Sequence, residues 1–216
     1  MNVDIFFDPI CPWCFIGKQR FDRAVTERPH VPLSRRWLPF QLNPGMPPEG
    51  MDRRSYLAAK FGGPERSRRV LGMVAETAAR DGLELRLDEI ARTPSTLDAH
   101  RLVRFAQREG SDPAVVIDAL FRAYFQDLRD IGDRATLIAI GADCGLDPGF
   151  LELHLASDEE VETVRGADAL ARRIGVQGVP CFVFDGRYAL AGAQEPQAFL
   201  PLFDMAAGTE PATGTG

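Results

Sequence analysis

The sequence predicts an α/β fold in which a long helical insertion interrupts a smaller domain of strands and helices. A short apolar run, residues 3–7, is followed by a helix-like segment and by a second apolar run at residues 31–40. These three segments predict a strand, a crossover helix and a parallel strand. Residues 52–156 are almost wholly helical in pattern, and residues 181–190 predict a two-stranded hairpin. The mixed domain should therefore draw on both ends of the chain.

Two cysteines, Cys11 and Cys14, lie between the first predicted strand and the first predicted helix. Apolar residues recur at helical spacing from Cys14 onward, so both cysteines belong to the start of that helix. A Cys-x-x-Cys in this position is a thioredoxin-like redox signature. The unpaired N–H groups at a helix start favour a thiolate. We therefore expect Cys11 to be the exposed attacking thiol and Cys14, one turn further on, to be the resolving thiol.

Pro12 and Trp13 separate the two cysteines and complete the motif. Pro12 suits an early helical position because it has no N–H to lose. Neither residue supplies a cation, so we expect a less oxidising pair than one with a central histidine. A zinc site is the alternative, but the other two cysteines, Cys144 and Cys181, are isolated in the sequence and no second ligand pair accompanies them. Both are expected to be buried core thiols.

A second signal lies where an apolar strand begins at Cys181, directly after Pro180. The Asp185-Gly186 pair predicts the hairpin turn that ends this strand. A proline that opens such a strand can be cis, and we expect a cis bond between Val179 and Pro180. In a thioredoxin-like fold this loop faces the two cysteines, so the backbone of Val179 would be free to pair with an extended peptide substrate. The alternative is an ordinary trans proline at a strand start.

Five segments together resemble the DsbA family of thiol–disulfide oxidoreductases, and specifically its FrnE-like subgroup. The resemblance spans nearly the whole chain and implies a thioredoxin-like fold interrupted by an all-helical insertion, with dithiol–disulfide exchange. Two residues depart from the subgroup: Ser95 stands where it often has Asn, and Cys181 stands where an aromatic residue or Thr is more usual. The five segments are Asp8–Cys14 with Gly17, Trp37–Pro44, Thr93–Arg101, Gly178–Pro180 and Ala191–Gln194.

The resemblance also implies three further candidate binding residues. In the related kappa-class glutathione transferases and 2-hydroxychromene-2-carboxylate isomerases, the region of Gly192 and Gln194 helps to hold glutathione; the alternative is a plain helix cap. His100 lies in a part of the insertion that can overhang the cysteines, where an imidazole could activate Cys11. The alternative is a histidine on a helix surface.

Two other functions remain open at this point. A glutathione-dependent isomerase or transferase can use the same fold, but those enzymes usually have a single serine at the position of Cys11 and no resolving thiol. The presence of Cys14 therefore favours redox exchange. A peptide-binding chaperone without a redox cycle is the third alternative.

The expected domain organisation is discontinuous. Residues 1–48 and 157–208 should form the thioredoxin-like domain, residues 49–156 the helical insertion or lid, and residues 209–216 a disordered tail.

Helix boundaries follow from capping residues, glycines and prolines. Ser157-Asp158-Glu159-Glu160 predicts a capping box for a helix that runs to Arg173, and residues 195–207 predict the final helix. Within the insertion, the expected helices cover residues 55–61, 65–80, 96–109, 112–127, 133–145 and a shorter one from residue 147, with residues 83–87 as an extended piece.

Composition limits the partners. The 31 acidic residues outnumber the 25 lysines and arginines, and the net charge of −6 argues against a nucleic-acid partner. No segment is long and apolar enough for a membrane span, and no signal peptide is visible. One local basic cluster is predicted to be a solvated helix face. It consists of Arg53, Arg54, Arg66, Arg68 and Arg69.

We therefore expect a cytoplasmic protein, in which the four cysteines would not form two structural disulfides. The expected substrate is a protein or small molecule that carries a thiol or a disulfide. No metal or bound organic cofactor is expected to be required, and glutathione is a candidate electron partner or ligand. Either a monomer or a homodimer fits the sequence.

Overall fold

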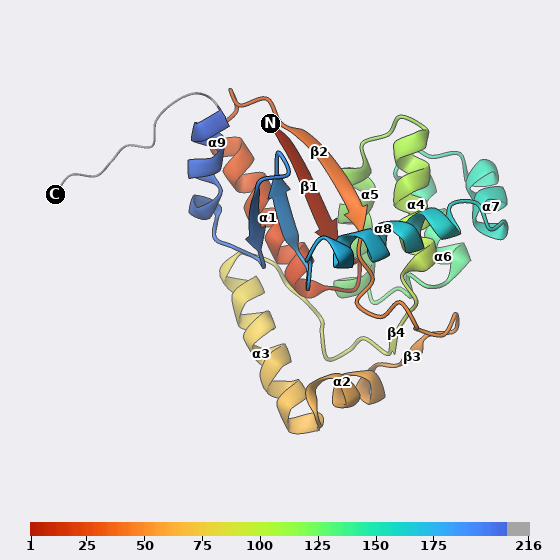
Figure 1. Ribbon diagram of the computed structural model, residues 1–216. Coiled ribbons are helices and arrows are strands. Elements are labelled where there is room, and N and C mark those ends of the chain that lie inside the picture. The colour runs from red at the N-terminus through yellow and green to blue at the C-terminus, as the bar shows by residue number, and fades with distance from the viewer. Residues whose placement is uncertain (207–216) are drawn as a thin grey trace.

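One mixed sheet joins the two ends of the chain in the computed structural model, which describes residues 1–206. The strand order is β2–β1–β5–β6. Strand β1 (Asn2–Phe7) pairs in parallel with β2 (Ser34–Pro39) and antiparallel with β5 (Cys181–Phe184), which pairs antiparallel with β6 (Tyr188–Ala191). The predicted parallel pair and the predicted hairpin thus lie side by side in one sheet (Figure 1).

Helices cover both faces of this sheet (Figure 1). Helix α1 (Pro12–Glu27), the short 3₁₀ helix η1 (Pro196–Ala198) and α9 (Leu200–Ala206) lie on one face, and α8 (Val161–Arg173) lies on the other. This arrangement confirms the predicted fold, a thioredoxin-like α/β domain with a helical insertion.

The side chains of β1 alternate between the two faces, as a strand requires. Ile5 and Phe7 belong to the large core that contains the aromatic side chains of α1, whereas Phe6 belongs to a smaller core under α8. In the large core, Phe21 of α1 stacks on Phe182 of β5, with ring centroids 5.2 Å apart. The alternation therefore allows one short strand to stabilise both layers.

The insertion is helical, as predicted, and each predicted helix forms with ends shifted by a few residues. Residues 83–87, predicted as extended, form no strand; instead a two-residue pair, β3 with β4, closes the base of the insertion. The elements are β3 (Met51–Asp52), α2 (Arg53–Phe61), α3 (Pro64–Arg80), β4 (Arg92–Thr93), α4 (Leu97–Arg108), α5 (Pro113–Phe125), α6 (Arg134–Asp143) and α7 (Pro148–Ala156).

Two buried cations on α1 tie the insertion to the thioredoxin-like part. Lys18, 3% exposed, forms an ion pair with Asp118 of α5 at 2.7 Å, and Arg20 forms one with Asp81, after α3, at 2.6 Å. One turn before Lys18, Phe15 stacks on a phenylalanine of α5 with ring centroids 5.0 Å apart. The helix that carries the cysteines is therefore also a support of the insertion.

Two predictions for the C-terminal helices are wrong, although α8 ends at Arg173 as predicted. The capping box does not form: the Ser157 hydroxyl donates to the carbonyl of His154 and accepts from the amide of Glu159, and α8 begins only at Val161. The predicted final helix is split into η1 and α9 around Phe199, whose side chain is fully buried. Residues 207–216, which include the predicted tail, lie outside the described part of the chain.

Arg101 on α4 is fully buried and closes the turn between α7 and α8. Its guanidinium donates to the carbonyls of His154 (2.5 Å), Leu155 (3.3 Å), Ser157 (2.7 Å) and Glu159 (2.8 Å). Leu155 and Ser157 lie at the C-terminus of α7, where carbonyls lack intrahelical donors and where a cation is favoured by the helix dipole. Arg101 is thus a structural residue that joins the insertion to α8.

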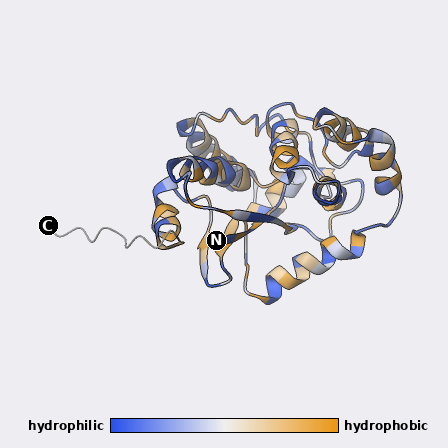
Figure 2. Cartoon of the chain, turned by 90° about the horizontal axis from the view of Figure 1, so that it is seen from above, coloured by the Kyte–Doolittle hydropathy of each residue, from blue (hydrophilic) through white to orange (hydrophobic). Residues whose placement is uncertain are grey.

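Most helices carry both hydrophobic and hydrophilic residues, as Figure 2 shows. Within residues 1–206, no helix combines the length and the hydropathy that crossing a membrane needs.

We predict that Arg101→Ala lowers the free energy of unfolding by about 3–5 kcal/mol, because it leaves several buried carbonyls without a donor. The control is Arg165→Ala, which removes an exposed pair with Glu162 and should cost less than about 1 kcal/mol. Urea denaturation of both variants measures the difference. Equal losses for the two variants would contradict a structural role of Arg101.

Candidate functional site

The two cysteines of the motif lie together at the start of α1. Cys11 is the N-cap residue, Pro12 is the first helical residue, and the amide of Cys14 donates to the carbonyl of Cys11 at 3.0 Å. The Cys11 side chain also hydrogen-bonds to that of Cys14. Both are free thiols in this structure. The sulfurs are therefore neighbours on one helical turn, as the motif predicts.

Cys11 is more covered than predicted. The residue is 4% exposed, whereas the sequence predicted an exposed thiol. Its Sγ donates to the carbonyl oxygen of Val179 at 3.5 Å, so the loop before β5 lies against the sulfur. The neighbouring Trp13 is half-buried and packs on the main core.

The Val179–Pro180 peptide bond is cis, in agreement with the prediction. Pro180 packs directly on α1 at Gly17: a Cβ atom built on Gly17 would lie 2.7 Å from Cγ of Pro180 and 3.4 Å from Cα of Ala193. Only glycine allows this approach. Because Gly17 follows Cys14 by one turn, the contact fixes the distance between the cysteines and the Val179 carbonyl.

Burial dominates the electrostatics of Cys14. Burial raises the pKa of its thiol well above the ordinary value, and the hydrogen bond to Cys11 raises it further. The backbone of Asp8 contacts the thiol and opposes this shift, while the charge of the Asp8 carboxylate adds to it. Cys14 is therefore a protonated thiol at neutral pH and needs a proton acceptor before it can act as a nucleophile.

Asp8 is a buried carboxyl group beside the motif that sequence reasoning did not single out. It accepts from the amides of Ile10 (3.2 Å) and Leu42 (2.6 Å), yet full burial raises its pKa to about 7. Thr96 and Lys60 oppose that shift weakly. The available signal was a single carboxylate between the apolar strand and the first cysteine.

His100 is inside the molecule. The residue is 0% exposed, its ring lies 5.0 Å from that of Phe7, and neither ring nitrogen has a hydrogen-bond partner of acceptable geometry. Burial lowers its pKa to about 4, and the backbone of Phe40 opposes this shift. The imidazole is therefore neutral at physiological pH. Because the side chain has no exposed surface, the predicted contact with a substrate is wrong, and so is the alternative of a histidine on a helix surface.

Gly192 and Gln194 lie next to the site but use their amides internally. The Gly192 amide donates to the carbonyl of Pro180 at 2.8 Å, and the Gln194 amide donates to the carbonyl of Gly192 at 2.9 Å. Arg20 holds this loop through the Ala193 carbonyl at 2.8 Å. Both amides are therefore engaged within the loop that anchors Pro180, and the glutathione contact of Gly192 and Gln194 stays a prediction.

The remaining two cysteines do not join the site. Cys181 is buried, as predicted, in the small core under α8 with Phe6 and Phe40, on the sheet face opposite α1. Cys144 is only half-buried, because it caps the C-terminus of α6 rather than lying within the helix. Among residues 1–206, no cluster of three or more His, Cys, Asp or Glu side chains could hold a metal ion.

Comparison with known proteins agrees with this geometry. A family model described as DSBA-like thioredoxin domain matches residues 2–203, so the chain belongs to the DsbA family. A probable DsbA oxidoreductase from Streptomyces coelicolor is 30% identical, with a TM-score of 0.88 over 100% of this chain and 94% of that chain. Thiol–disulfide oxidoreductase chemistry is therefore the activity of the family to which this chain belongs.

Two more distant structures share the fold. A 2-hydroxychromene-2-carboxylate isomerase is 18% identical, with a TM-score of 0.69 over 96% of this chain and 95% of that chain. The cytosolic disulfide reductase DsbM from Pseudomonas aeruginosa, solved with glutathione, is 21% identical, with a TM-score of 0.61 over 96% of both chains.

We predict that Gly17→Ala slows thiol–disulfide exchange and lowers the free energy of unfolding by about 1–3 kcal/mol, because the new methyl group pushes Pro180 and Val179 away from Cys11. Gly166→Ala on α8 is the matched control: its Cβ meets open space, so activity should be unchanged and stability equal or up to about 1 kcal/mol higher. Stopped-flow exchange and urea denaturation measure both effects. If both variants behave alike, the contact does not position the site.

We predict a pH-dependent stability difference between the wild type and Asp8→Asn. Because folding raises the pKa of Asp8 from 3.8 to about 7, the carboxyl stabilises the fold fully below pH 3.8, and this contribution is lost as the pH rises to about 7. The wild type should therefore lose on the order of a few kcal/mol relative to the variant across this range. Urea denaturation at a series of pH values measures the difference, and a flat difference rules out the raised pKa.

Proposed function

We propose that this protein is a thiol–disulfide oxidoreductase that cycles Cys11 and Cys14 between a dithiol and a disulfide. The observation that carries the proposal is the neighbouring pair of free thiols at the start of α1, facing the Val179 carbonyl. Membership of the DsbA family supports it. The substrate is a protein or small molecule that carries a disulfide or a thiol.

In the reducing direction, the Cys11 thiolate attacks one sulfur of a substrate disulfide. A bond forms between Cys11 and that sulfur, the substrate S–S bond breaks, and the other substrate sulfur leaves as a thiolate that takes up a proton. Cys14 then attacks Cys11 and releases the second substrate thiol. The substrate gains two electrons and two protons, and the enzyme becomes the Cys11–Cys14 disulfide. The oxidising direction is the reverse.

The second attack needs a proton acceptor, since burial keeps Cys14 protonated. Asp8 is buried beside this thiol and its pKa of about 7 lies near neutral pH, which suits a group that gains and loses a proton. We assign to it the proton that Cys14 releases. The proton taken up by Asp8 must pass to solvent before the next cycle, and the charge of Lys60 favours the ionised carboxyl that results.

The expected direction is reduction or isomerisation rather than bulk oxidation. A strong oxidant of this class depends on a reduced form that is strongly stabilised. Here Pro12 and Trp13 supply no cation, and both cysteines are buried. Glutathione is the proposed electron donor: two molecules would reduce the enzyme disulfide and leave as glutathione disulfide. A cytoplasmic location fits this direction.

Nothing specific favours the isomerase, transferase or chaperone alternatives over redox exchange. The isomerase or transferase activity would depend on a bound glutathione and not on Cys14, whereas the redox cycle requires both sulfurs. The chaperone activity would require neither sulfur. Substitution of Cys11 and Cys14 therefore distinguishes the three functions.

We predict that the wild type reduces insulin disulfides with glutathione as electron source. Cys11→Ser should abolish this activity, and Cys14→Ser should leave a stable mixed disulfide between Cys11 and substrate, visible by mass spectrometry. Cys144→Ser is the control and should retain wild-type activity, because Cys144 lies outside the site. The turbidity of precipitating insulin measures the reduction of its disulfides. The redox equilibrium of Cys11 and Cys14 in a glutathione buffer measures the reduction potential of the pair.

Three outcomes would contradict the proposal. A pair that cannot be converted between dithiol and disulfide would end it. Full activity of the Cys11→Ser and Cys14→Ser double variant would support the chaperone alternative. A reduction potential near about −120 mV, the value of a strong periplasmic oxidant, would overturn the proposed direction.

A further inference from the structure

A pocket in the insertion lies away from the cysteines. It has a volume of about 840 Å³ and is bounded by the start of α2, one side of α3 and residues 85–91. Its lining includes the apolar side chains of Leu57, Leu71, Leu87 and Ile90. A volume of this size is typical of small-molecule sites, and the lining combines these apolar side chains with polar and charged ones. None of the four cysteines lines it.

Arg53 gives one end of this pocket an uncompensated positive charge. The residue is 4% exposed, yet it forms no ion pair with any carboxylate of residues 1–206. Its Nη1 donates only to the neutral hydroxyls of Thr93 (3.2 Å) and Tyr124 (3.1 Å), and its Nε is buried without a partner. Burying a cation without a counter-ion costs free energy of folding. An anion bound beside Arg53 would offset this cost.

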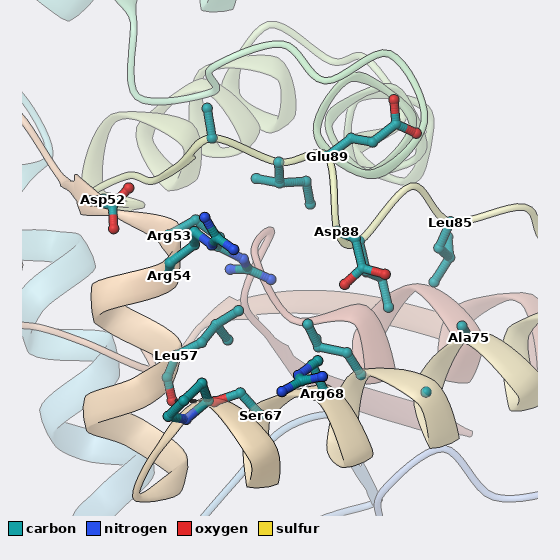
Figure 3. Close-up of a pocket in the computed structure, with 16 residues that line it drawn as sticks. Asp52, Arg53, Arg54, Leu57, Ser67, Arg68, Ala75, Leu85, Asp88 and Glu89 are labelled. Atoms are coloured by element: carbon teal, nitrogen blue, oxygen red, sulfur yellow. Dashed lines mark hydrogen bonds between the residues drawn. The ribbon is translucent and has the colours of Figure 1, made fainter.

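The burial of Arg53 corrects the sequence prediction that the arginine cluster is a solvated helix face. The other four members, Arg54 among them, are exposed as predicted. Arg54 forms no ion pair within the described residues and lines the same pocket. Figure 3 shows Arg53 and Arg54 together at one side of the pocket, across from Asp88.

Three carboxylates line the pocket, and only Asp52 lies beside Arg53 and Arg54, so this end keeps a net positive charge. Asp52 is engaged as the N-cap of α2, where it accepts from the amide and hydroxyl of Ser55 at 2.8 Å. Glu89 is paired with Arg86 at 2.6 Å. Asp88, like Asp52, forms no ion pair among residues 1–206, and it lies at the other side of the pocket (Figure 3). An anion can therefore reach Arg53 and Arg54 without displacing a carboxylate.

Gly72 keeps the apolar part of the pocket open. It lies inside α3, lines the pocket, and a Cβ atom built on it meets no atom within 4 Å. Glycine inside a helix costs about 0.5–1 kcal/mol relative to alanine, and neither a positive φ nor a close contact requires it here. The missing side chain thus leaves room beside Leu57 and Leu71.

We propose that this pocket binds a small organic acid with an apolar body, whose carboxylate forms a two-pronged ion pair with Arg53 and Arg54. Guanidinium groups bind carboxylates with two parallel hydrogen bonds, and the apolar body covers the leucine and isoleucine side chains. This binding activity is separate from the proposed redox cycle and does not depend on it.

The test is calorimetric titration of the full chain with decanoate below its micellar concentration, alongside decan-1-ol. Decanoate should bind with one-to-one stoichiometry and at least tenfold more tightly than the alcohol, which has the same chain but no charge. It should also raise the melting temperature, as any ligand of the folded state does. Equal binding of the acid and the alcohol would overturn the proposal.

Matched variants locate the site. Gly72→Phe should weaken decanoate binding at least tenfold by filling the pocket, while Gly166→Phe, at an open exposed position on α8, should not change it. Arg54→Gln should weaken binding, and Asp88→Asn should leave it unchanged or tighten it. These variants keep the test valid if Arg53→Gln fails to fold.

Redox measurements separate this proposal from the preceding one. Insulin reduction by Gly72→Phe should equal that of the wild type, so either function can fail alone. Wild-type affinity in Gly72→Phe would overturn the proposed site. The proposal would also be overturned if ultracentrifugation showed that the wild type is a dimer and that Gly72→Phe is a monomer. A second copy of the chain would then occupy the pocket.

Discussion

The contact between Gly17 and Pro180 is the constraint on which the rest of the site depends. A helix and a loop from opposite ends of the chain approach more closely there than any side chain on Gly17 would permit. The approach brings the Val179 carbonyl to 3.5 Å from the Cys11 sulfur. The amide of Gly192 donates to the carbonyl of Pro180, and the guanidinium of Arg20 donates to the carbonyl of Ala193. The residues implied as ligand contacts therefore hold the loop that covers the thiol.

Several charged side chains are buried in this fold, and most of them have partners that offset the cost of desolvation. Helix α1 carries two buried cations, Lys18 and Arg20, and both reach carboxylates of the insertion. Arg101 does the same for backbone carbonyls at the end of α7. In each case excellent geometry offsets the cost of desolvation. Asp8 and Arg53 differ, because neither has a full counter-charge, and these two residues mark the places where protonation or ligand binding would relieve that cost.

Much of the fold followed from local patterns. The strands, the hairpin and the insertion helices were predictable because alternation, helical spacing and capping residues act over a few neighbouring positions. Asp112, Asp133 and Asp147 all cap helices as expected. The wrong boundaries lie at helix ends: the Ser157 hydroxyl donates to a carbonyl of the preceding helix, and the last helix is divided into η1 and α9 at Phe199.

The sequence by itself determined the chemistry: two sulfurs one helical turn apart, a proline at the strand start and the order of strands and helices around them. Only the tertiary structure decided the environment of those groups, namely the cover over Cys11, the burial of Asp8 and His100 and the pocket beside Arg53. Desolvation depends on atoms contributed by distant segments, and no spacing along the chain reports how they assemble.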